Sequence, residues 1–120
     1  MTPFGARVRS LRQAKGIQLK RMAGDLHLSA AYLSALEHGR RGRPAPGLVM
    51  QIAGYLGCIW DEAEDLKTLA EISHPRVVVD TAGLSPARTE LANRLARRIG
   101  DLPDDVVDRM LALMDDALST

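Results

Sequence analysis

The chain has 120 residues, a formal net charge of +1 and a single cysteine, Cys58. This length fits one domain, or one small domain with an appendage. A lone cysteine excludes an internal disulfide and a cysteine-based zinc cluster. No apolar run approaches the roughly 18 residues of a membrane span, and no signal peptide precedes the first expected helix. We therefore expect a cytoplasmic protein with no cofactor and no metal.

The small net charge conceals an asymmetry between the two halves of the chain. Residues 1–60 contain nine basic and two acidic residues, whereas residues 61–120 contain seven basic and thirteen acidic ones. Such asymmetry favours a polyanion as partner of the first half, and a solvated basic surface is the alternative.

Helix-period patterns separated by glycines predict five helices in residues 1–73. In chain order they are a helix around Phe4 and Val8, one from roughly Gln18 to Asp25, one capped by Ser29, one after the loop 40–46 and one starting near Asp61. Four glycines follow helical runs and are predicted left-handed caps, namely Gly16, Gly39, Gly57 and Gly100. We expect Cys58, Trp60 and Ile72 to contribute to the core.

The pattern changes after Pro75. Residues 76–81, Arg-Val-Val-Val-Asp-Thr, are β-prone, but no second strand is predicted anywhere in the chain. Because a lone strand cannot satisfy its backbone hydrogen bonds, this run is either an extended linker or half of a sheet completed by a second copy. Two further helices are predicted, starting at Ser85-Pro86 and at Pro103.

The last predicted helix carries two adjacent apolar stripes, one of Val106, Met110, Leu113 and Ala117 and the other of Val107, Leu111, Met114 and Leu118. A stripe of that width exceeds what one intramolecular contact covers, so we expect part of it to meet a partner; the alternative is that both stripes fold back on the first domain. The expected dimerisation residues are Val77, Val78, Val79, Leu91, Leu95, Val107, Met110, Leu111 and Met114.

Short motifs in a fixed order extend over about residues 4–70. They are Val8-Arg9, Leu11-Arg12, Gly16, Met22-Ala23, Leu28-Ser29, Tyr32-Leu33-Ser34, Leu36-Glu37, Gly39, Pro44, Leu48, Ile52-Ala53 and Leu56-Gly57. As a set they resemble the phage repressor and Cro (XRE) type of helix-turn-helix. Two positions depart from that family: Leu19 replaces a phosphate-contacting glutamine, and His27 replaces the usual turn glycine. Histidine tolerates a positive φ better than most residues, so the turn is expected to survive.

The resemblance implies a mainly α fold. A five-helix repressor-type helix-turn-helix domain is expected in residues 1–73 and an extended or β linker in residues 74–84. Two C-terminal helices, forming a dimerisation region, are expected in residues 85–120.

The resemblance also implies that the third helix reads double-stranded DNA. The expected DNA-binding residues are Arg9, Arg12, Gln18, Lys20, Ser29, Ala30, Ala31, Tyr32, Ser34, His38, Arg40, Arg41 and Arg43. The groove-facing positions of the third helix include no Arg, Lys, Asn or Gln, the types that make bidentate base contacts, so direct readout is expected to be thin. Phosphate contacts and DNA shape, probed by the arginines of the 40–43 loop, would then supply much of the affinity and specificity.

We therefore expect a sequence-specific transcriptional regulator, nucleoid-associated, that acts as a homodimeric repressor on an inverted-repeat operator. The alternatives are an antitoxin whose acidic second half binds a toxin, and a subunit that recruits another protein to DNA. A protein anti-repressor is a further candidate partner. Glu37 has no nucleophile or metal ligand beside it in the sequence, so a structural carboxylate is expected there and no enzyme is predicted.

Overall fold

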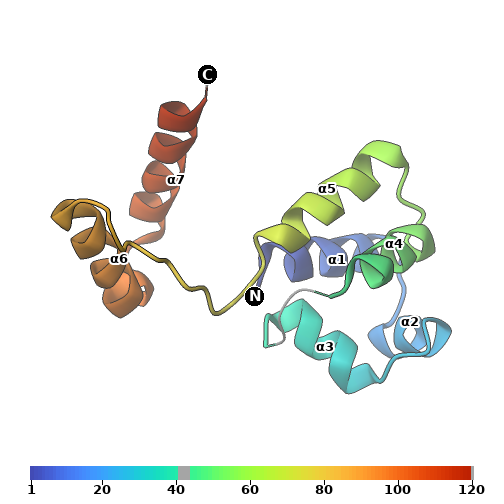
Figure 1. The fold of residues 1–120 in the computed structure, drawn as a ribbon. Coiled ribbons are helices and arrows are strands. Elements are labelled where there is room, and N and C mark those ends of the chain that lie inside the picture. The colour runs from blue at the N-terminus through green and yellow to red at the C-terminus, as the bar shows by residue number, and fades with distance from the viewer. Residues whose placement is uncertain (41–43, 120) are drawn as a thin grey trace. The chain divides into compact units, whose positions relative to one another are not determined.

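The computed structural model describes residues 1–40 and 44–119, which form helices joined by turns and one long linker (Figure 1). The helices are α1 Pro3–Ala14, α2 Leu19–Asp25, α3 Ala30–His38, α4 Pro46–Tyr55, α5 Trp60–Glu71, α6 Pro86–Arg98, the 3-10 turn η1 Ile99–Asp101 and α7 Asp104–Leu118. No strand occurs in these residues, which confirms the mainly α prediction. None of the helices so described is long and apolar enough to cross a membrane.

The chain divides into two compact units, Met1–Val77 and Val78–Thr120. The first unit contains α1 to α5 around one hydrophobic core. Its buried apolar residues are Phe4, Val8, Met22, Ala23, Leu33, Leu36, Val49, Ile52, Ala53, Leu56, Leu66 and Ala70. Every one of the five helices contributes to this core, so α3 is held by its neighbours on its inner side.

The turns between these helices follow the sequence signals. Ser29 caps α3, and its Oγ accepts a hydrogen bond of 3.0 Å from the backbone N–H of Tyr32. Gly16, Gly39 and Gly57 adopt positive φ angles, as predicted. His27 does so too, with a φ of 58°, at the turn between α2 and α3.

Two predicted core residues of α5, Trp60 and Ile72, are exposed instead. Trp60 is the first residue of α5 and is 81% exposed, and Ile72 follows the last residue of the helix and is 65% exposed. Both lie six residues from Leu66, which is buried on the core-facing side of α5 together with Ala70. At 100° per residue, six residues rotate a side chain by about 120° away from the core-facing stripe. Cys58 packs partly buried against the core, and this burial raises the pKa of its thiol, which favours a packing role.

The structure corrects one prediction for residues 76–100 and decides between two alternatives for another. Gly100 is not a left-handed cap, because it lies inside η1; the positive-φ glycine of this part of the chain is Gly83 in the linker. Residues 76–81 form no strand, so the extended-linker alternative holds within one chain. Pairing of this segment between two copies stays a prediction.

The second unit has no core of its own. Ser85 caps α6, accepting a hydrogen bond from the backbone N–H of Arg88. None of the described residues from 78 to 119 is buried. The large apolar side chains that it exposes are Val78, Val79, Leu84, Leu91, Ile99, Leu111, Leu113, Met114 and Leu118. Exposed apolar surface of this extent marks an interaction surface.

Within the first unit, α1 approaches the end of α3 very closely. A Cβ added at Gly5 would lie 2.6 Å from the carbonyl oxygen of Glu37 and would also overlap the carbonyl oxygen of Leu36. Both obstacles are backbone atoms, which cannot rotate away. Only glycine therefore permits this contact between the two helices.

An ion pair joins the same two helices. The Arg12 guanidinium donates from Nε to Glu37 Oε2 at 2.8 Å and from Nη2 to Glu37 Oε1 at 3.0 Å. A third bond, from Nη1 to the Ile17 carbonyl at 2.9 Å, fixes the α1–α2 turn. The Glu37 side chain is 1% exposed and that of Arg12 is 11% exposed. The hydrogen bonds to Glu37 raise the pKa of Arg12, and Glu37 takes a structural role.

We predict that Gly5→Ala destabilises the protein by about 1–3 kcal/mol, because the added methyl group overlaps two backbone carbonyls. The matched control is Gly54→Ala in α4, where an added Cβ meets nothing within 4 Å. That change should be neutral or stabilising by about 0.5–1 kcal/mol. Urea unfolding followed by far-ultraviolet circular dichroism measures both, and equal effects would contradict the close approach of α1 and α3.

We predict that Arg12→Ala costs about 3–5 kcal/mol of unfolding free energy, because it leaves the Glu37 carboxylate buried without a counter-charge. Arg7→Ala, at an exposed position of the same helix, should cost no more than about 0.5 kcal/mol. The paired change Arg12→Met with Glu37→Leu removes both charges and should recover much of the loss. If Arg12→Ala matched Arg7→Ala in urea unfolding, the ion pair would not hold α3.

Candidate nucleic-acid interface

The outer face of α3 is built from small side chains. Leu33, Leu36 and Glu37 lie buried on the inner side of this helix. Of the predicted reading positions, Ala31 and His38 are exposed on the opposite side of the helix, and Ala30 is exposed as its first residue. Tyr32 and Ser34 are half-buried on its flanks. Because methyl groups and hydroxyls are small, the surface of another molecule can approach the backbone of this helix closely.

The N-terminal end of α3 is open to a negative charge. Ser29 is exposed, and its Oγ already accepts a hydrogen bond from Tyr32, so its hydroxyl proton is left to donate outward. The first backbone N–H groups of a helix have no intrahelical acceptor and carry the positive end of the helix dipole. This end can therefore bind a phosphate group.

At the other end of α3, His38 has a fixed ring orientation. Its Nδ1 lies 2.8 Å from the Ser34 carbonyl oxygen. Because a carbonyl can only accept a hydrogen bond, Nδ1 carries the proton and donates it. The Nε2 atom of this exposed ring is then the one left to contact a base or a phosphate.

The region around α2 contributes both polar and basic groups. Gln18 is the exposed residue before α2, and its side chain makes no capping hydrogen bond, so its amide is available to a ligand. Lys20 is exposed on the first turn of α2. The Tyr55 hydroxyl of α4 donates to Asp25 Oδ2 at 2.7 Å, and this bond raises the pKa of Tyr55. The bond ties the end of α2 to α4 just before the turn at His27.

The arginines expected to contact DNA differ in their surroundings. The guanidinium of Arg12 is bound to Glu37 and Ile17, so we do not include it among the proposed phosphate contacts. Arg9 is half-buried on α1 and Arg40 is exposed after α3. Arg41 and Arg43 lie outside the described residues.

A basic groove that the sequence did not predict lies beside the end of α3. It has a volume of about 470 Å³ and is lined by Gly39, Arg40, His74, Pro75 and Arg76. Arg76 thereby joins Arg40, although 36 positions separate them in the chain. No local pattern could have revealed this pairing, because it depends on how α5 returns the chain to the end of α3.

A metal site does not compete with α3 among the described residues. The residues that the structure describes include no group of three or more His, Cys, Asp or Glu side chains that could hold a metal ion. Trp60 is exposed beside Ile59, which is 67% exposed, and neither lines a described groove.

The comparisons with known proteins match the same part of the chain. A family model described as a helix-turn-helix domain matches residues 3–66, more than half of the chain. Two proteins of Bacillus subtilis (strain 168) are similar. One, described as the uncharacterized HTH-type transcriptional regulator RghRB, is 36% identical over 56 residues, 47% of this chain and 40% of that protein. The other, the HTH-type transcriptional repressor RghR, is 34% identical over 53 residues, 44% of this chain and 39% of that protein.

The chain spans about two fifths of the length of these relatives, and no solved structure matches it significantly. The matched residues contain α1 to α4, with the capped α3 and the turn at His27, and about half of α5. The chain belongs to the helix-turn-helix domain family, in its phage repressor and Cro (XRE) type.

Proposed function

We propose that this protein is a transcriptional repressor that binds an inverted-repeat operator in double-stranded DNA as a homodimer. The observation that carries the proposal is the exposed face of α3, which combines an N-terminus capped by Ser29 with small side chains and the exposed His38. The name of one relative, a transcriptional repressor, favours repression over activation.

In this mechanism α3 enters the major groove, as the second helix of a helix-turn-helix does. The methyl groups of Ala30 and Ala31 contact thymine C5-methyl groups, and Ser34 and His38 supply single hydrogen bonds to base edges. Ser29 and the N-terminal backbone amides hold a phosphate. Such contacts discriminate weakly, because none of them is bidentate.

Phosphate contacts then supply most of the affinity. The proposed donors are Arg9, Gln18, Lys20, Arg40 and, from the basic groove, Arg76. Arg41 and Arg43 complete the set as predictions from the sequence. Each neutralised phosphate lowers the logarithm of the binding constant by about 0.9 per tenfold rise in salt, so binding should weaken steeply with ionic strength.

A dimer compensates for the weak readout of one α3. Two copies related by a two-fold axis reach half-sites about 34 Å apart and combine their affinities. The second unit is the proposed dimerisation region, because it exposes apolar residues and contains no buried residue among those described. A bound dimer would repress by covering a promoter.

We predict that Ala31→Glu abolishes retention of specific genomic fragments, because a carboxylate on α3 meets the phosphates and base acceptors of the groove. Purified wild-type protein, incubated with fragmented genomic DNA near physiological salt, should retain a short set of sequences that share an inverted repeat. The control is Ala96→Glu on the exposed side of α6, the same substitution in the second unit, which should retain the same set. Unchanged retention by Ala31→Glu would refute α3 as the reading helix.

We predict that Leu111→Asp, which places a charge in an exposed apolar stripe of α7, yields a monomer with at least about tenfold weaker operator binding, because the two half-sites are no longer linked. Ala112→Asp adds the same charge at an exposed position outside both stripes and should remain dimeric. Sedimentation velocity and a gel-shift titration measure the two properties. A dimeric Leu111→Asp protein would refute this role of α7, and a wild-type monomer would favour the toxin-binding alternative.

A further inference from the structure

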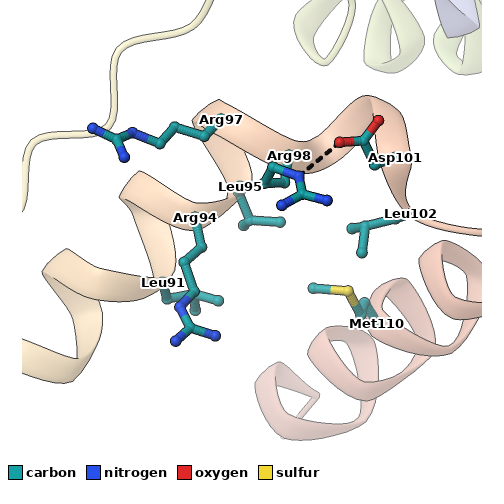
Figure 2. A pocket seen from close by; sticks show the side chains of 8 residues that line it. All are labelled: Leu91, Arg94, Leu95, Arg97, Arg98, Asp101, Leu102 and Met110. Carbon is teal, nitrogen blue, oxygen red and sulfur yellow. Dashed lines mark hydrogen bonds and ion pairs between the residues drawn. The ribbon is translucent and has the colours of Figure 1, made fainter.

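An open groove separates α6 from α7 within the second unit. Figure 2 shows Leu91 and Leu95 of α6 on one side and Met110 of α7 on the other, with Leu102 at the closed end. The groove has a volume of about 610 Å³, the size of clefts that bind small molecules, so it has room for several side chains of another helix.

The α6 side of this groove has a basic border. Arg94, Arg97 and Arg98 line the groove from α6. Arg94 and Arg98 lie three and seven residues after Leu91, which places them on the same helix face. Arg94 pairs with Glu90 at 2.9 Å and Arg98 with Asp101 at 2.7 Å. The side chains of both arginines remain more than 70% exposed, so a second carboxylate can still approach them.

A second apolar stripe of α7, beside the one that contains Met110, has an acidic border. It consists of Val107, Leu111, Met114 and Leu118, of which the last three are more than half exposed. Asp104, Asp108 and Asp115 lie seven and three residues before and four residues after Leu111, along one edge of this stripe. None of the three has an ion-pair partner among the described residues.

The two apolar stripes of α7 are offset around the helix, so they are exposed to different degrees. Met110 lines the groove of its own chain, and Leu111 is rotated from it by about 100°. Val107 and Met114 lie three and four residues from Met110 and share part of its face. Leu111, Met114 and Leu118 nevertheless remain more than half exposed, so this part of the stripe is left for another molecule.

We propose that the groove of each copy receives the acid-bordered stripe of α7 from the second copy, so that Asp108 and Asp115 meet Arg94 and Arg98 across the dimer interface. The chain itself supplies an apolar groove with a basic border and an apolar stripe with an acidic border. A two-fold axis brings both pairs together at once, since each copy offers both surfaces. This arrangement rests on the homodimer of the proposed function and specifies which helices form it.

Charge exchange tests this pairing. One variant carries Arg94→Glu and Arg98→Glu, and a second carries Asp108→Arg and Asp115→Arg. Each alone places like charges opposite one another at both contacts, so dimerisation should weaken at least about tenfold. A mixture of the two restores opposite charges at both contacts and should form a heterodimer. A single chain with all four changes should dimerise like the wild type, and it shows that the altered residues permit folding.

Sedimentation velocity on each protein and on the mixture distinguishes the outcomes. Weak self-association of both variants, with recovery in the mixture and in the four-change chain, supports the pairing. A wild-type dimer with variants that dimerise equally well, or with no recovery on mixing, overturns the pairing but leaves the homodimer intact. A wild-type monomer overturns both the pairing and the homodimer.

Discussion

The buried ion pair between Arg12 and Glu37 decides which face of α3 meets solvent. A carboxylate that is 1% exposed is tolerable only with its counter-charge in place, and Arg12 supplies this from α1 with two hydrogen bonds. Since Glu37 lies in the last turn of α3, fixing it inward also turns Ala31 outward, because Ala31 lies six residues away and about 120° around the helix. Gly5 serves the same end, because its missing side chain lets the α3 backbone approach α1 closely enough for the pair to form. Arg12, which the sequence predicted to contact phosphate, thus has a structural role in the first unit: it orients α3, the helix proposed to read DNA.

The two units divide the physical work of this protein. The first has its own core and carries the basic groups beside α3. The second has apolar stripes and charged borders but no buried residue among those described, so a two-fold partner would complete its packing. In the proposed homodimer, folding of the second unit, dimerisation and operator affinity would depend on the same contacts. All three then respond together to protein concentration, which acts as a ligand would on each equilibrium.

Sequence patterns predicted the elements well where a local signal marked their ends. Ser29 and Ser85 both cap the helices that they were expected to start, and His27 adopts the positive φ of the turn. The predictions were wrong for residues at the ends of a helix, where the sequence had to indicate whether a side chain faces the core or the solvent. Trp60 and Ile72 are apolar, but both are rotated out of the α5 stripe, and hydrophobicity alone cannot indicate direction over so short a span. The partners of Arg12 and the meeting of Arg40 with Arg76 depend on how distant helices pack, and no spacing in the chain encodes them.

The outward position of Trp60 has a practical consequence for optical work on this protein. It is the only tryptophan of the chain, and its indole is 81% exposed in the folded state. The wavelength of indole emission depends on the polarity around the ring. Because the ring is already in contact with water in the folded state, unfolding should shift its emission maximum little. The same property makes it a clean sensor of contact, because a blue shift of its emission would report a second molecule covering the start of α5.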